Sequence, residues 1–168
     1  MYQTRWMLVM AIGTGAMAAA LGAQSPINAC TWFTQADIER ITGQKSLVTG
    51  TGDFTSLAGG AGSACTWGEL GAQIVIFSGA KSDELFENYL KNFKKDKEAR
   101  RALSGVGERA YIMFPKPRDQ YEDRVAVVVV KKGEHTLGVS VSAPDGKTQE
   151  SVEPSVIAFT KVVLTKVP

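Results

Sequence analysis

Two β-forming runs joined by a short turn limit the folds open to this chain more than any other feature. Residues 124–130 predict a strand that, after Arg124, is apolar on both faces, which is typical of a strand inside a sheet. Residues 135–142 alternate between apolar and small polar side chains, as a strand does when one face is buried. Because only residues 131–134 separate the runs, they predict an antiparallel hairpin. The chain must then build an antiparallel sheet covered by amphipathic helices.

Three segments predict the helices that cover this sheet. The first has Thr34 as N-cap, Asp37 completing a capping box, and Gly43 ending the helix. The second has acidic residues in its first turn, one apolar face and a basic C-terminal part. The predicted bounds are about 35–42, 82–101 and 150–165.

The remaining predicted strands are short. They cover residues 45–49, 64–69, 72–78 and 110–114. Apart from the weak strand at 45–49, the Gly-rich segment 43–64 predicts a loop. The resulting order is α-β-β-β-α-β-β-β-α. It predicts an α+β fold with an antiparallel sheet of about five or six strands and two or three helices packed on it.

The N-terminal residues 1–23 predict a secretory signal peptide. Arg5 is their only charge, and residues 6–21 form an uncharged run that ends in small residues. A retained membrane anchor is the alternative, but this run of 16 residues is shorter than the roughly 20 that a spanning helix needs. We expect cleavage within residues 20–24, which leaves residues 24–168 as a single exported domain.

Two cysteines, Cys30 and Cys65, allow two interpretations. Export places them in an oxidising compartment, where they can form a disulfide. Alternatively, residues 27–30 loosely fit the end of a lipoprotein signal, with Cys30 receiving the lipid. Lipidation would leave Cys65 unpaired, whereas a disulfide uses both thiols, so we favour the disulfide.

Three short motifs stand out along the exported part of the chain. They are Cys30-Thr31-Trp32-Phe33-Thr34-x-x-Asp37, Cys65-Thr66-Trp67 after the Gly-rich loop, and Gly105-Val106-Gly107-Glu108-Arg109-Ala110 before a strand. Together they resemble a group of small exported bacterial proteins and lipoproteins, mostly actinobacterial, catalogued as domains of unknown function. Departures from that group's pattern are Trp32-Phe33 for an aliphatic pair and Glu108 for Asp. The resemblance implies export, a disulfide, a PsbP-like fold and a non-catalytic domain, with no known ligand.

Catalytic and metal chemistry have little support in the sequence. Two cysteines and one histidine cannot supply a four-ligand zinc site of the Cys/His type. A Ser-His-Asp triad would have to use His135, which the pattern places as an exposed residue after a turn. The net charge of +2 is too small to indicate nucleic acid. We therefore expect no catalytic residues, no metal and no cofactor.

Two groups of side chains are candidates for binding. The first is the basic end of the second predicted helix, suited to an anionic envelope component: Lys91, Lys94, Lys95, Lys97, Arg100 and Arg101. The second is the pair Trp32 and Trp67 beside the cysteines, which form either a small core or a platform that stacks on a ligand.

The expected function is that of an exported, non-enzymatic envelope or secreted domain, acting as a binding module. Its expected partner is an anionic envelope component or another exported protein. Three alternatives remain: a lipoprotein anchored through Cys30, an enzyme of an undetected class, and a secreted enzyme inhibitor. An inhibitor would present the Pro-bounded loop 115–120 or one face of the strand at 135–142.

Overall fold

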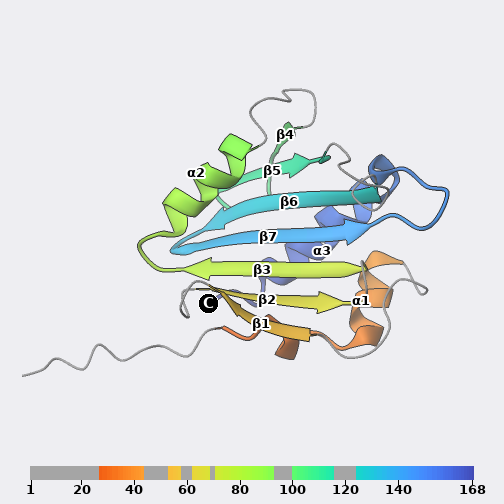
Figure 1. The fold of residues 1–168 in the computed structure, drawn as a ribbon, viewed down its shortest axis with the longest axis horizontal. Helices are drawn as coiled ribbons and strands as arrows, with labels where there is room; N and C mark the ends of the chain where they lie inside the picture. The colour runs from red at the N-terminus through yellow and green to blue at the C-terminus, as the bar shows by residue number, and fades with distance from the viewer. Residues whose placement is uncertain (1–26, 44–52, 58–61, 69–70, 93–99, 116–123) are drawn as a thin grey trace, which may run out of the picture.

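A seven-stranded antiparallel sheet organises the chain in the computed structural model, which describes residues 27–43, 53–57, 62–68, 71–92, 100–115 and 124–168 (Figure 1). The strands are β1 Asp53–Leu57, β2 Gly62–Trp67, β3 Ala72–Ser78, β4 Arg100–Leu103, β5 Arg109–Met113, β6 Val125–Lys132 and β7 His135–Ser142. The helices are α1 Gln35–Thr42, α2 Ser82–Asn92 and α3 Glu153–Leu164, with 3-10 turns η1 Ala29–Thr31 and η5 Gln149–Val152. The α+β class predicted from the sequence is confirmed.

The predicted hairpin forms the middle of the sheet. The strands lie in the order β1-β2-β3-β7-β6-β5-β4, so both β6 and β7 have neighbours on each side. Val128 of β6 lies opposite Val139 of β7, and Lys132 lies opposite His135 at the turn. Because β6 lies inside the sheet and both of its faces are covered, it carries valines on both faces.

The two faces of the sheet are covered unequally. On one, called here the α3 face, Leu137, Val139 and Val141 pack under η1, α1 and α3 in the larger core. On the other, called the α2 face, Phe86 and Leu90 of α2 form a smaller core with strands β5 and β6. Figure 1 shows α2 and α3 on opposite sides of the sheet. The alternation along β7 thus decides which helix each side chain meets.

The capping box predicted for the first helix is confirmed. Thr34 accepts a hydrogen bond from the Asp37 backbone N–H, and the Asp37 carboxylate accepts from the Thr34 backbone N–H at 3.0 Å. Gly43 ends α1 with φ of 71°, in the left-handed region that glycine adopts without steric cost. Ile38 is fully buried, which fixes the helix against the α3 face.

Asp37 gives α1 a pH-dependent stability. Hydrogen bonds from Thr34, and then from Arg40, lower the pKa of Asp37 from 3.8 to about 2. Because the folded pKa lies below the unfolded one, the stabilisation is complete above about pH 5 and is lost as the pH falls through 2. In urea titrations we expect Asp37→Asn to lower stability at pH 5, and we expect its difference from the wild-type protein to disappear only as the pH falls through 2. Arg40→Gln should retain most of the pH dependence, because Thr34 supplies the larger contributions; equal losses in both variants would contradict this account.

Two strands differ from the sequence predictions. The weak strand predicted at residues 45–49 lies outside the described residues. A strand that was not predicted, β1, forms at Asp53–Leu57, inside the segment predicted as a loop. The second helix is described only to Asn92, and Arg100 begins the strand β4 rather than ending a helix. The sheet therefore has one strand more than the upper estimate of six. Both strands lie at the edges of the sheet. Edge strands in general bury fewer side chains than interior strands, so their hydrophobic pattern in the sequence is weak.

The third helix begins later than predicted. The residues from Gln149 form the 3-10 turn η5, and α3 starts at Glu153 with Pro154 in its first turn. Proline is tolerated there because the first backbone N–H groups of a helix have no partner within it. Within the described ranges, no helix combines the length and the apolar character needed to cross a membrane.

Candidate functional site

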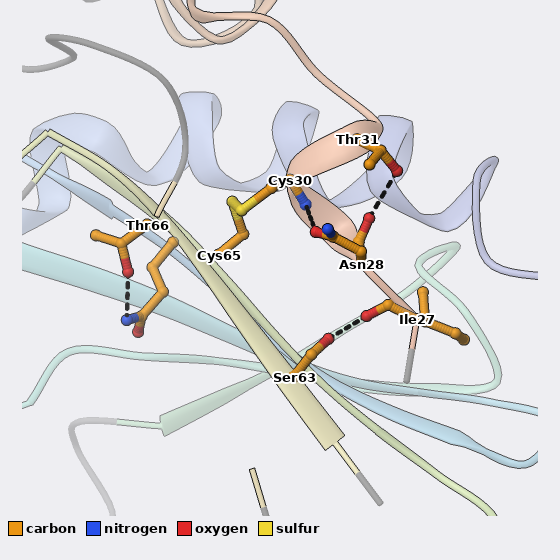
Figure 2. The surroundings of a disulfide bond; sticks show 8 residues. Ile27, Asn28, Cys30, Thr31, Ser63, Cys65 and Thr66 are labelled. Carbon is orange, nitrogen blue, oxygen red and sulfur yellow. Dashed lines mark hydrogen bonds between the residues drawn. A yellow bond between two sulfur atoms is a disulfide. The ribbon is translucent and has the colours of Figure 1, made fainter. Parts of the chain in front are cut away.

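The predicted disulfide between Cys30 and Cys65 is present and joins η1 to β2, with 5.3 Å between the two Cα atoms (Figure 2). Asn28 caps η1 by accepting a hydrogen bond from the Cys30 backbone N–H at 3.0 Å. Ser63 Oγ donates to the Ile27 carbonyl, so a second contact ties the same segment to the same strand. The segment before α1 is therefore held on β2 at two points two residues apart.

Aromatic side chains fill the core beside this disulfide. Phe33, Trp67 and Phe159 meet edge to face, with ring centroids 5.5 to 6.5 Å apart. Trp67 has no exposed surface, so in this conformation it packs the core and cannot stack on a ligand. Trp32 is partly buried and packs against the same core. Of the two interpretations of these tryptophans, the small core fits the observed packing.

The basic candidates are divided between the two faces of the sheet. Lys91 is exposed at the end of α2, and Arg100 lies beside it, donating to the Leu90 carbonyl at 3.4 Å. Arg101, the next residue along β4, points to the opposite face and forms an ion pair with Glu153 of α3. Lys94, Lys95 and Lys97 lie outside the described residues. The basic stretch is therefore not one continuous helical face.

Arg109 joins these cations although sequence reasoning did not select it. Its guanidinium lies 4.7 Å above the ring of Phe86 and pairs with Glu87 at 3.0 Å. The hydrogen bond that Arg109 donates to the Glu87 carboxylate is the main cause that raises the pKa of Arg109. Alternation along β5 places Arg109 and Tyr111 on the α2 face. In the sequence, this alternation is the pattern that could have identified Arg109.

We call the group Lys91, Arg100, Arg101 and Arg109 the basic edge, because β4 is the last strand on this side of the sheet. Arg100 stacks on Tyr111, with 5.0 Å from its guanidinium carbon to the ring centroid. Glu87 and Glu153 neutralise Arg109 and Arg101. Among the described residues, Lys91 and Arg100 have no carboxylate partner, so the described part of the edge carries a net positive charge. Such a surface can attract and orient an anionic group.

His135 is more enclosed than the sequence indicated. It is the first residue of β7, is half-buried, and its Nδ1 lies 2.8 Å from Ser78 Oγ. Partial burial is the main cause that lowers the pKa of His135, so the ring is neutral near pH 7. A neutral imidazole beside a serine hydroxyl resembles a nucleophile and its base.

The remaining parts of such a catalytic arrangement are missing from the surroundings of His135 that the structure describes. The Gly79 backbone N–H, which follows the serine, donates to the Glu134 carbonyl at 3.0 Å and is not free to bind an oxyanion. No described carboxylate forms a hydrogen bond with the imidazole to orient it. The pair Ser78 and His135 is therefore a cross-link between the ends of β3 and β7.

Two consecutive lysines at the end of β6 fasten helices on opposite faces. Lys131 is nearly buried, donates to Ser82 Oγ at 2.7 Å and pairs with Asp83 at 3.0 Å, at the start of α2. Lys132 donates to the carbonyls of Leu164 and Val167 at 3.0 and 2.7 Å, at the end of α3. A cation at a helix C-terminus also meets the favourable end of the helix dipole. These lysines are structural contacts rather than parts of a binding site.

The motif at residues 105–110 has a structural explanation. Val106 inserts into the α3-face core, and the Glu108 backbone N–H donates to the Lys131 carbonyl at 2.9 Å. The Glu108 carboxylate accepts from the Gly133 N–H at 2.7 Å, so the turn packs on the β6–β7 hairpin. Gly107 has φ of 60°, and a Cβ there would lie 2.7 Å from the Lys131 carbonyl oxygen. The close approach of two backbones requires this glycine.

No protein-family model, curated protein or solved structure matches this chain. Within the part of the chain that the structure describes, no three His, Cys, Asp or Glu side chains are grouped so that they could hold a metal ion. The basic edge is therefore the strongest candidate site on charge and geometry alone.

Proposed function

We propose that this chain is an exported, non-enzymatic domain of the bacterial envelope that binds an anionic partner through its basic edge. Two features support export. The uncharged run at residues 6–21 has the pattern of a secretory signal, and the Cys30–Cys65 disulfide needs an oxidising compartment to persist. Because both thiols are used in that bond, the proposal favours a free exported domain over one lipidated at Cys30.

The observation that carries the binding proposal is the placement of Arg100. Stacking on Tyr111 and the hydrogen bond to Leu90 hold its guanidinium in one position, while no described carboxylate neutralises it. A cation that is already ordered loses little conformational entropy when it binds an anion. Exposed Lys91 directly follows Leu90, whose carbonyl accepts from Arg100, and adds a second charge at this end of α2. The basic edge therefore offers a fixed positive site rather than a set of freely moving lysines.

Neutralising the edge should weaken binding of anionic envelope material. The protein for this test is collected as exported from a bacterial host, and N-terminal sequencing should place its first residue within residues 21–24. Lys91→Gln with Arg100→Gln should lower cosedimentation with phosphatidylglycerol vesicles or anionic cell-wall polymer by about tenfold, since each lost charge contact contributes about 0.5–1 kcal/mol. Binding of the wild-type protein to the same anionic material should fall as salt rises from about 50 to about 500 mM.

Lys161→Gln with Lys166→Gln is the matched control, because both lysines are exposed on and just beyond α3. It should leave binding unchanged. Equal losses in the two double variants would show that net charge alone is responsible, and a chain retained in the cytoplasm would contradict the export part of the proposal.

A further inference from the structure

The two edges of the sheet differ in how they are covered. At the β1 edge, η1 packs against β1 and β2, and the disulfide fixes it there. At the other edge, no described helix or strand lies beyond β4 (Figure 1). An edge strand presents unpaired backbone N–H and C=O groups that can pair with another chain.

The strand β4 has a regular backbone. All four of its residues pair in unbroken register with β5, from Arg100 opposite Met113 to Leu103 opposite Ala110. It contains neither proline nor glycine and no bulge. Natural edge strands are commonly protected by such irregularities or by charges that extend past the edge. Within the described residues, any protection of β4 must therefore come from its two arginines.

Both arginines are directed inward rather than across the edge. Arg100 contacts Tyr111 on the neighbouring strand and the Leu90 carbonyl on α2, all on the α2 face. Arg101 pairs with Glu153 on α3, on the α3 face. Each guanidinium is held over a face of the sheet by groups that lie inside the edge. The outer backbone groups of β4 thus lie beside Arg100 on the α2 face, which has no described carboxylate partner, and beside Arg101 on the α3 face, which Glu153 neutralises.

We propose that β4 pairs with an extended acidic segment of another exported protein, which adds an eighth strand to the sheet. This inference rests on the proposed function and names the partner of the basic edge. Backbone hydrogen bonds would supply affinity, as in other cases of strand addition. Residues that lie opposite one another on adjacent strands share a face.

The charges on β4 then predict which residues the added strand should carry. An acidic residue opposite Arg100 would place a carboxylate on the α2 face, where no described carboxylate neutralises that arginine. Small or apolar residues are expected opposite Ala102 and Leu103. An anionic membrane or polymer has the charge but no strand to pair, so the two classes of partner can be separated by experiment.

The test uses the exported protein and fluorescein-labelled ten-residue peptides of Val, Thr and four Glu residues. A second peptide has the same sequence with N-methyl groups on four consecutive central residues, which removes hydrogen bonds along both edges of the peptide. A third carries Lys in place of Glu. We expect the acidic peptide to bind, with affinity at least about tenfold lower after N-methylation because several backbone hydrogen bonds are lost. Amide NMR shifts should change most at residues 100–103.

Arg100→Gln with Arg101→Gln should weaken binding of the acidic peptide, and Lys161→Gln with Lys166→Gln should not. Equal binding of the N-methylated peptide would overturn strand addition in favour of simple charge attraction. Binding to phosphatidylglycerol vesicles without binding to the acidic peptide would overturn this inference and leave the proposed function standing. Absence of binding to either probe would overturn both.

Discussion

Replacing both Cys30 and Cys65 by serine is expected to lower the free energy of unfolding by as much as about 3.5–4 kcal/mol. The disulfide closes a loop with a sequence separation of 35 residues, and the estimate is the entropy that this closure removes from the unfolded chain. A typical domain has only about 5–15 kcal/mol of stability in total, so the variant should lose a large part of it. The loop contains α1 and β1, and the N-terminal third should therefore loosen first.

Urea unfolding of the unmodified protein, the unmodified protein with a reducing agent, and the double variant would measure this effect. Reduction should reproduce the variant, because both remove the same covalent link. Thiols are counted in the exported protein under denaturing, non-reducing conditions. Two free thiols there would contradict the disulfide, and equal stability of all three samples would contradict its contribution.

Replacing Gly107 by alanine is expected to destabilise the fold by about 2–5 kcal/mol. Part of this cost, about 1–2 kcal/mol, comes from the left-handed backbone at φ of 60°. The rest comes from the new Cβ, which would meet Val130 Cγ2 at 2.4 Å and the Lys131 carbonyl oxygen at 2.7 Å. Relieving such contacts requires a backbone shift of the kind that overpacking imposes, at about 1–3 kcal/mol.

Gly105→Ala is the matched control for this variant. Gly105 has φ of 70°, but nothing lies within 4 Å of the position that a Cβ would occupy. It should therefore show only the backbone cost of about 1–2 kcal/mol. Thermal unfolding followed by circular dichroism would compare the two variants. Equal losses at both positions would mean that the close approach to β6 does not matter.

The parts of the fold that the sequence predicted well are those that burial or capping determines. The hairpin of β6 and β7 has long apolar runs because both strands lie inside the sheet, and α1 has a capping residue at each end. The edge strands gave weaker patterns. β4 consists of Arg-Arg-Ala-Leu directly after a basic stretch, and its composition does not separate a helix end from an edge strand.

The same ambiguity limited the prediction of the candidate site. Consecutive residues of a helix point about 100° apart, and Arg100 and Arg101 would then share one basic side. In a strand they point to opposite faces, and the structure gives them different partners, Tyr111 and Glu153. The secondary structure determines which cations share a face. Because β4 was predicted as the end of a helix, Arg100 and Arg101 were predicted to share one surface.

Lys131 and Lys132 have a consequence for how the molecule opens. Since the last two residues of β6 hold the start of α2 and the end of α3, loss of this end of the strand would release both helices together. The two layers on either side of the sheet are therefore not independent units of local unfolding. The amides of both helix ends should exchange with solvent as one cooperative group, whose rate is set by the tip of the hairpin rather than by either helix.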